Sequence, residues 1–134
     1  MKRPLDHARA LLEKARHDLA IGTLGLADEE VADMVCFHAQ QGVEKSLKAL
    51  IAAQGADYPL THDLEVLLKI AGAFWSPSEE MARAIIDLSG YAVAVRYDED
   101  EIPSEQEAQA ALSTAEQVSA LVAKLVEELD SAVA

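Results

Sequence analysis

The sequence predicts an all-α fold, in which residues 1–134 form a single-domain antiparallel up-and-down bundle of about five helices. The apolar residues of every segment repeat with the 3.6-residue period of a helix, and no segment alternates with the two-residue period of a strand. The composition is 51% hydrophobic but only 4% aromatic. Alanine and leucine dominate it, and both residues lose little entropy in a helix. Six glycines and four prolines leave few positions for the turns of an all-β fold.

The first half of the chain is expected to form two long helices. Pro4 suits the first turn of the first helix, and its apolar stripe extends to about residue 27. That stripe consists of Leu5, Ala8, Leu12, Ala15, Leu19 and Leu26. Asp28 is a suitable N-cap for a second helix, which runs to about Gln54 and ends at Gly55. The apolar face of this second helix carries Cys36, Val43, Leu47 and Leu50.

Start and stop signals predict a third and a fourth helix. Thr61 or His62 opens the short third helix, which Gly72 closes. Residues 76–79 (Ser-Pro-Ser-Glu) combine an N-cap, a proline at the first helical position and a glutamate at the third. A fourth helix is therefore expected from this point to about Arg96.

An acidic loop precedes the last helix. Six acidic residues lie between Asp98 and Glu107, and Pro103 interrupts the loop. Ser104 and Glu107 form a capping box at the start of the helix. Its inward positions are Leu112, Ala115, Val118, Val122, Leu125 and Leu129.

The net charge of −13 limits the classes of partner that this protein can bind. The sequence has 24 acidic residues and only 11 basic ones. A protein that grips a phosphate backbone by itself normally presents a basic face. Binding to DNA and to an anionic membrane surface is therefore disfavoured. A small nucleotide, a local RNA contact near the few basic residues, or a basic protein partner remains compatible with this charge.

Cysteine and histidine usage predicts neither a disulfide nor a metal or other cofactor. Cys36 is the single cysteine and lies on an apolar helix face, which favours a buried structural thiol. His7 and His17 do not have the spacing of metal ligands. The N-terminal residues lack the apolar core of a signal peptide, and no apolar run is long enough to span a membrane. A cytoplasmic location is expected.

The second predicted helix carries a polar stripe opposite its apolar face. His38, Gln41, Lys45 and Lys48 lie within about 80° of arc on that side. An imidazole, an amide and two ammonium groups in a row are suited to a phosphate, a nucleobase edge or a carboxylate-bearing partner. The alternative interpretation is a solvated helix face, whose lysines pair with nearby acids such as Glu44.

Two further polar stretches have both a functional and a structural interpretation. Arg96 and Tyr97 follow the fourth predicted helix, where a guanidinium is suited to a phosphate and a ring to stacking on a base. The alternative is that Arg96 pairs with a nearby acid and Tyr97 packs against the end of the bundle. Residues 61–63 (Thr-His-Asp) combine a hydroxyl, an imidazole and a carboxylate. Capping of the third helix explains this run better than catalysis does.

Residues 37–50 (Phe-His-Ala-Gln-Gln-Gly-Val-Glu-Lys-Ser-Leu-Lys-Ala-Leu) closely resemble the second-helix signature of HEPN domains, the higher eukaryotes and prokaryotes nucleotide-binding family. Residues 61–64 (Thr-His-Asp-Leu) and 91–97 (Tyr-Ala-Val-Ala-Val-Arg-Tyr) agree with this family in the expected order. The resemblance covers essentially the whole chain. It implies a helical bundle that is usually a homodimer and is often encoded beside a minimal nucleotidyltransferase, as a toxin–antitoxin-like pair.

The resemblance also implies a test for catalysis. Many members of the family are metal-independent RNases, in which an arginine is followed by a histidine about four to six residues later. Arg96 matches the arginine, but Glu101, Ile102 and Pro103 occupy the positions of the histidine. None of these three side chains replaces an imidazole near neutral pH. No catalytic residue is therefore assigned.

Three hypotheses follow from the sequence. The first is a nucleotide- or RNA-binding HEPN protein that works with a minimal nucleotidyltransferase and uses Arg96 and Tyr97, with His38, Gln41, Lys45 and Lys48 as further contacts. The second is a metal-independent ribonuclease that combines Arg96 with a displaced base such as His38. The third is a helical scaffold, whose polar stripe forms the seam of a dimer.

Overall fold

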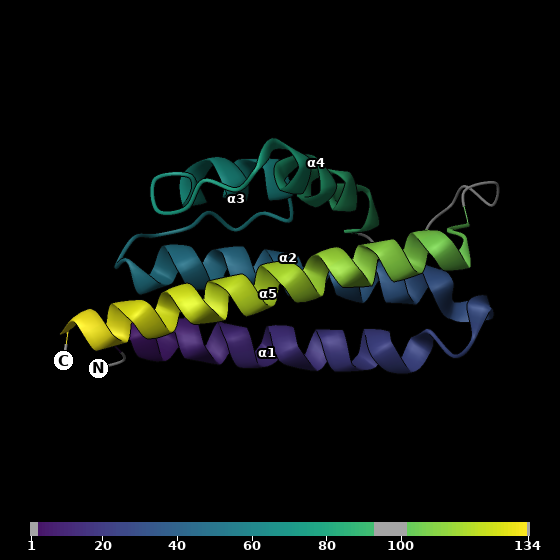
Figure 1. The fold of residues 1–134 in the computed structure, drawn as a ribbon, viewed down its shortest axis with the longest axis horizontal. Coiled ribbons are helices and arrows are strands. Elements are labelled where there is room, and N and C mark those ends of the chain that lie inside the picture. The colour runs from purple at the N-terminus through teal and green to yellow at the C-terminus, as the bar shows by residue number, and fades with distance from the viewer. Residues whose placement is uncertain (1–2, 93–101, 134) are drawn as a thin grey trace.

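Three long helices form the body of the molecule, and two short helices lie along one side of it (Figure 1). The computed structural model describes residues 3–92 and 102–133. The long helices are α1 (Pro4–Gly25), α2 (Ala32–Ala53) and α5 (Glu105–Val133). The short elements are η1 (Glu29–Val31), α3 (Leu64–Ala71), α4 (Glu79–Asp87) and η2 (Leu88–Tyr91), where η denotes a 3-10 helix. The described residues contain no strand, and the predicted all-α bundle is confirmed.

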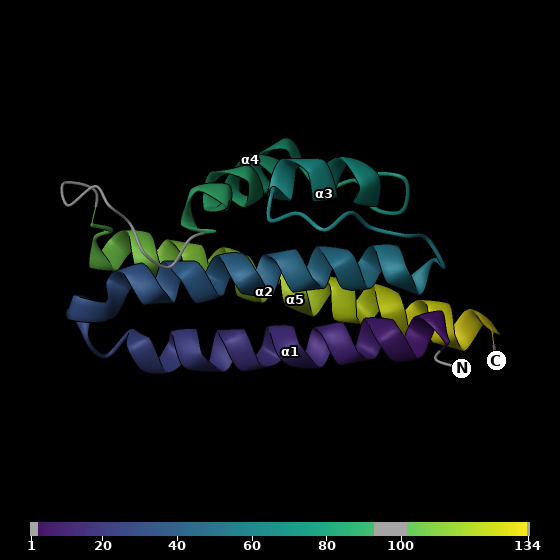
Figure 2. The ribbon, with the colours of Figure 1, turned by 180° about the vertical axis from the view of Figure 1, so that it is seen from behind.

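The chain runs up and down along the long axis of the molecule. Helix α1 leads away from the end at which both termini lie, and α2 returns to it (Figure 1). Helices α3 and α4 together carry the chain back, so α5 runs in the same direction as α2. Helix α3 lies on α2, on the side away from α1, and α4 contacts α3 and α5 (Figure 2). Helix α2 is therefore the central element of the fold.

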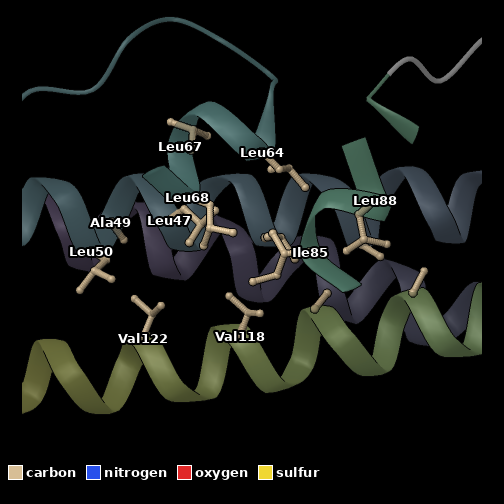
Figure 3. Packing of buried hydrophobic residues seen from close by; sticks show 14 of the residues in the cluster. Leu47, Ala49, Leu50, Leu64, Leu67, Leu68, Ile85, Leu88, Val118 and Val122 are labelled. Atoms are coloured by element: carbon tan, nitrogen blue, oxygen red, sulfur yellow. The ribbon is translucent and has the colours of Figure 1, made fainter. Parts of the chain in front are cut away.

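Helix α2 is buried on almost every side because it contacts α1, α3, α5 and η2. Its predicted apolar face lies in the core, where Cys36 and Leu47 have no exposed surface. Leu64 of α3, Ile85 of α4 and Val118 of α5 belong to the same cluster (Figure 3). Burial of one such aliphatic side chain contributes about 1.5–3 kcal/mol. Packing around α2 is accordingly the main source of stability.

Helices α1 and α2 approach each other closely at Gly42. A Cβ atom at this position would lie 3.0 Å from Leu19 Cδ2 and 3.8 Å from the carbonyl oxygen of Ala15. The Ser46 hydroxyl, also buried here, donates to the carbonyl oxygen of Gly42 at 2.7 Å. The glycine thus brings the polar side chains on this face of α2 within reach of α1.

The starts of three helices differ from the sequence prediction. Asp28 caps η1 by accepting from the Glu30 amide, and α2 begins only after this short helix. Ser78, rather than Ser76, caps α4 and accepts from the Met81 amide at 3.1 Å. This cap places two glutamates in the first turn, where the helix dipole favours them. Helix α3 likewise begins after Asp63, which accepts from two amides of the first turn, and not at Thr61 or His62.

The prediction that the fourth helix extends to Arg96 is wrong over residues 88–92. Helix α4 ends at Asp87, and the chain continues as the 3-10 helix η2. The Ser89 hydroxyl accepts from the Leu64 amide at 3.0 Å, which ties this turn to the start of α3. Gly90, a poor helix former, follows directly. Arg96 itself lies outside the described residues.

Two other helix-end predictions are confirmed. Ser104 and Glu107 form the predicted capping box, because each side chain accepts from the other residue's amide, at 3.3 and 3.1 Å. Gly55 lies just beyond α2 and has a φ of 77°, a left-handed conformation that glycine adopts without strain.

Candidate functional site

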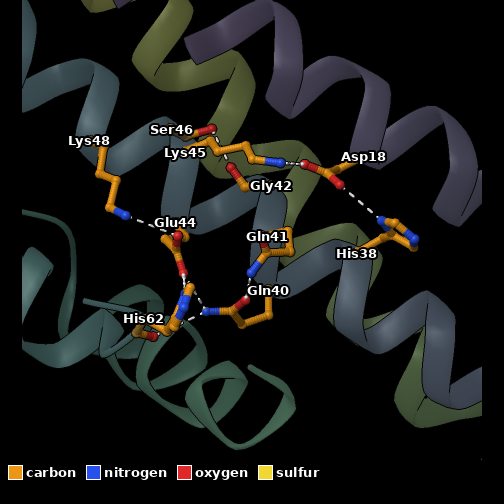
Figure 4. Close-up of polar contacts among 10 residues, drawn as sticks. All are labelled: Asp18, His38, Gln40, Gln41, Gly42, Glu44, Lys45, Ser46, Lys48 and His62. Atoms are coloured by element: carbon orange, nitrogen blue, oxygen red, sulfur yellow. Dashed lines mark hydrogen bonds and ion pairs between the residues drawn. The ribbon is translucent and has the colours of Figure 1, made fainter. Parts of the chain in front are cut away.

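A buried carboxylate on α1 gathers two basic side chains of α2 (Figure 4). The side chain of Asp18 is 9% exposed. Its Oδ1 lies 2.9 Å from His38 Nδ1, and its Oδ2 accepts from Lys45 Nζ at 2.5 Å. His38 and Lys45 lie about two helical turns apart on one face of α2, so one carboxylate links them. We call these three residues the Asp18 cluster.

The basic ends of the Asp18 cluster reach solvent. The carboxylate offsets the charge of Lys45 within the cluster. The side chains of His38 and Lys45 are 19% and 26% exposed. An ammonium group carries three hydrogens, and Asp18 uses one of those on Lys45. The arrangement is therefore suited to one anionic group rather than to a long polyanion.

Two arginines of α1 are paired with acids outside the Asp18 cluster. Arg16 binds Glu13 one turn away, and this hydrogen bond lowers the pKa of the Glu13 carboxyl below its ordinary value. Arg9 donates to Asp130 of α5 at 2.6 Å. The Arg16 pair is exposed and contributes little to stability, whereas the Arg9–Asp130 pair is partly buried. They differ from the Asp18 cluster, whose acid is buried.

A second buried carboxylate, Glu44, binds the same kinds of partner toward the α2–α3 loop (Figure 4). Its side chain is 5% exposed, accepts from Lys48 Nζ at 3.0 Å and lies 2.7 Å from His62 Nδ1. The fully buried Gln40 donates to Glu44 Oε1 at 3.3 Å and to the His62 carbonyl oxygen at 3.1 Å. We call these four residues the Glu44 cluster. The Glu44 cluster attaches the loop before α3 to the central helix α2.

Aromatic contacts extend the attachment of this loop to α1. Lys48 Nζ lies 5.5 Å from the ring centre of Tyr58, a favourable position for a cation above an aromatic face. The Tyr58 hydroxyl is 2.9 Å from His7 Nε2, and the two rings are stacked. The Glu44 cluster and these contacts together hold the loop between α2 and α3 at two points.

Three of the four residues of the predicted polar stripe of α2 are divided between the two clusters. His38 and Lys45 bind Asp18, whereas Lys48 binds Glu44. Gln41 donates to the Gln40 side-chain oxygen at 2.7 Å. All four side chains of the stripe are half-buried. Two predicted contact residues, Arg96 and Tyr97, lie outside the described residues.

Residues 61–63 do not converge on one site. Thr61 Oγ1 accepts from the Asp63 amide, and Asp63 caps α3. The His62 imidazole instead contacts Glu44. The capping interpretation of Asp63 is confirmed, and His62 belongs to the Glu44 cluster.

Sequence reasoning missed Asp18 as part of the site. A signal for it exists in the sequence: Asp18 follows Ala8 and Ala15 of the predicted apolar stripe at helical spacing, and the structure buries all three. A carboxylate in a buried register requires hydrogen-bonding partners. That signal predicts a partner for Asp18 without saying which residues supply it.

The described residues offer no evident place for a metal ion or a membrane span. No group of three or more histidine, cysteine, aspartate or glutamate side chains within residues 3–92 and 102–133 is placed to hold a metal. In the same ranges, no helix combines the length and the apolar character needed to cross a membrane.

The fold and the site define a helical bundle with two acid-centred clusters on its central helix. Residues 8–126 match the model of the HEPN domain family. The chain therefore belongs to the HEPN family. No curated protein matches the chain.

Solved structures share this fold. The protein TT1696 from Thermus thermophilus is 29% identical, with a TM-score of 0.77 over 89% of this chain and 98% of that chain. The archaeal HEPN homologue ST0689 is 20% identical, with a TM-score of 0.74 over 94% and 99% of the two chains. The HEPN domain protein TM0613 from Thermotoga maritima is 24% identical, with a TM-score of 0.58 over 92% and 97%.

Proposed function

We propose that this HEPN protein binds a nucleotide or an RNA end through the solvent-facing edge of the Asp18 cluster. The observation that carries this proposal is that one buried carboxylate holds an imidazole and an ammonium group side by side, with both partly exposed. Gln41 lies between them on α2 and supplies a polar neighbour. Arg96 and Tyr97 are proposed as further contacts, on the basis of the sequence.

Lys48, although it belongs to the polar stripe, is not part of the proposed ligand contact. Its side chain is 12% exposed and donates to Glu44, so little of it is available to a ligand. We therefore assign Lys48 to the attachment of the α2–α3 loop. The proposed contact surface consists of His38, Gln41 and Lys45, with Arg96 and Tyr97.

The proposed role is binding rather than cleavage, because no histidine follows Arg96 at the spacing of the RNase motif. We further propose that the protein acts as a homodimer with a minimal nucleotidyltransferase. The net charge of −13 is suited to a basic surface on such a partner. Co-purification of the two proteins at a fixed ratio tests this pairing, and separate elution of the two proteins at low salt contradicts it.

Substitution of Lys45 by methionine is expected to weaken nucleotide binding by about tenfold or more. Methionine keeps the apolar stem but removes a charge-assisted hydrogen bond, which contributes about 1.5–3 kcal/mol. Titration calorimetry with a panel of ribonucleotides and a short RNA measures the change. Lys124→Met, at an exposed position of α5, is the matched control and is expected to leave the affinity unchanged.

The same samples separate the competing functions. If neither the nucleotides nor the RNA bind to the wild-type protein, the binding proposal is wrong and the scaffold hypothesis is favoured. RNA incubated with a chelating agent is expected to stay intact. Cleavage that is lost in Arg96→Ala would instead favour the ribonuclease.

A further inference from the structure

Asp18 determines which nitrogen of His38 carries the proton. An ionised carboxylate accepts hydrogen bonds and donates none, so the hydrogen between Asp18 Oδ1 and His38 Nδ1 belongs to the imidazole. The other carboxylate oxygen, Oδ2, accepts from the ammonium group of Lys45. A neutral His38 then carries its proton on Nδ1 and leaves Nε2 as an acceptor. No described residue is hydrogen-bonded to this Nε2.

The cluster therefore offers a ligand two different groups. Lys45 offers donors to an anionic oxygen, whereas His38 Nε2 accepts a proton or a hydrogen bond. Both groups contact the same carboxylate and are partly exposed, so one ligand fragment with a donor and an anionic oxygen is suited to contact both. In a ribonucleotide, the 2′-hydroxyl and the 3′-phosphate lie on adjacent carbons of the sugar, and they supply a donor and an anion within such a fragment.

We propose that Asp18 is a positioning residue, which makes the site selective for a ribonucleotide 3′-phosphate over its 2′-deoxy counterpart. This inference rests on the proposed function and names its ligand class. The 3′-phosphate binds Lys45, and the neighbouring 2′-hydroxyl donates to His38 Nε2. A 2′-deoxyribonucleotide keeps the first contact and leaves the imidazole without a partner.

Asp18→Asn is expected to reverse the His38 tautomer. The asparagine directs its carbonyl oxygen toward the Lys45 ammonium group, which only donates, so its amide nitrogen faces His38. Nδ1 must then accept, and the imidazole proton moves to Nε2. The same substitution of an aspartate beside a catalytic histidine is known to produce the wrong tautomer. Nitrogen-15 NMR of the histidine side chains detects the change directly, and His38→Leu identifies the His38 signals.

Calorimetry with 3′-AMP and 2′-deoxyadenosine 3′-phosphate measures the selectivity. The wild-type protein is expected to prefer the ribonucleotide by about tenfold, the effect of one hydrogen bond. His38→Leu is expected to lose this preference. Asp18→Asn is expected to weaken it, because the 2′-hydroxyl can also accept from Nε2–H of the reversed imidazole but the ring loses its charged partner. The two variants keep the inference testable if one of them fails to fold. Asp6→Asn makes the same chemical change at a half-buried acid of α1 that binds Arg3, and it is expected to keep the preference.

Each unfavourable result has a distinct meaning. Equal affinity of the wild-type protein for the two nucleotides overturns the ribonucleotide selectivity and leaves the binding function intact. A wild-type His38 protonated on Nε2, or a tautomer unchanged in Asp18→Asn, overturns the positioning role. If neither nucleotide nor any other ligand of the panel binds, the proposed function fails together with this inference.

Discussion

Replacement of Glu44 by alanine is expected to lower the free energy of unfolding by about 3–5 kcal/mol, because it breaks a buried ion pair by removing one partner. Lys48, which is 12% exposed, loses its anionic partner, and the fully buried Gln40 loses one of its acceptors. His62, in the loop before α3, also loses its contact with α2. Urea denaturation followed by circular dichroism measures the loss.

Two variants test the cause of this loss. Glu65→Ala removes an exposed acid, whose nearest contact to Lys69 is 3.9 Å, and is expected to change stability by less than about 0.5 kcal/mol. Glu44→Met combined with Lys48→Met removes both charges and is expected to recover part of the stability. A loss below about 1 kcal/mol in Glu44→Ala would show that solvent reaches this cluster.

Replacement of Leu47 by alanine is expected to cost about 2–5 kcal/mol, because it leaves a cavity in the core. Leu47 has no exposed surface and belongs to the cluster formed by α2, α3, α4 and α5 (Figure 3). Thermal and urea unfolding measure the change. Leu60→Ala is the matched control: this leucine is 98% exposed, so its loss is expected to have almost no effect on stability. Equal effects of the two substitutions would contradict the assigned core.

The fold class was predictable from the sequence because it depends on local patterns. The apolar residues of α2 repeat at helical spacing, and Cys36 and Leu47 are buried as that pattern predicts. The capping box at Ser104 and Glu107 is a contact between residues three positions apart, so it too is visible in the sequence. Both features require only the geometry of a single helix.

Helix ends were less predictable than the helices themselves. The cap of α4 was predicted at Ser76, whereas the helix uses Ser78, two residues later. The early end of α4 involves the hydrogen bond between Ser89 and the Leu64 amide, two residues that lie 25 positions apart. Such a contact exists only after α3 and η2 have packed together, and no periodicity predicts it.

The candidate site also combines features that the sequence shows and contacts that only the folded chain makes. The sequence alone determined that this chain is a helical bundle, that it resembles the HEPN family and that α2 carries His38, Gln41, Lys45 and Lys48 on one side. Only the tertiary structure decided how these side chains are used. Asp18 lies 20 residues from His38 and 27 from Lys45, on another helix, so their contacts depend on how α1 packs against α2. Gly42 permits that close packing. Because burial of an unpaired carboxylate is costly, Asp18 is stable there only with its hydrogen-bonding partners.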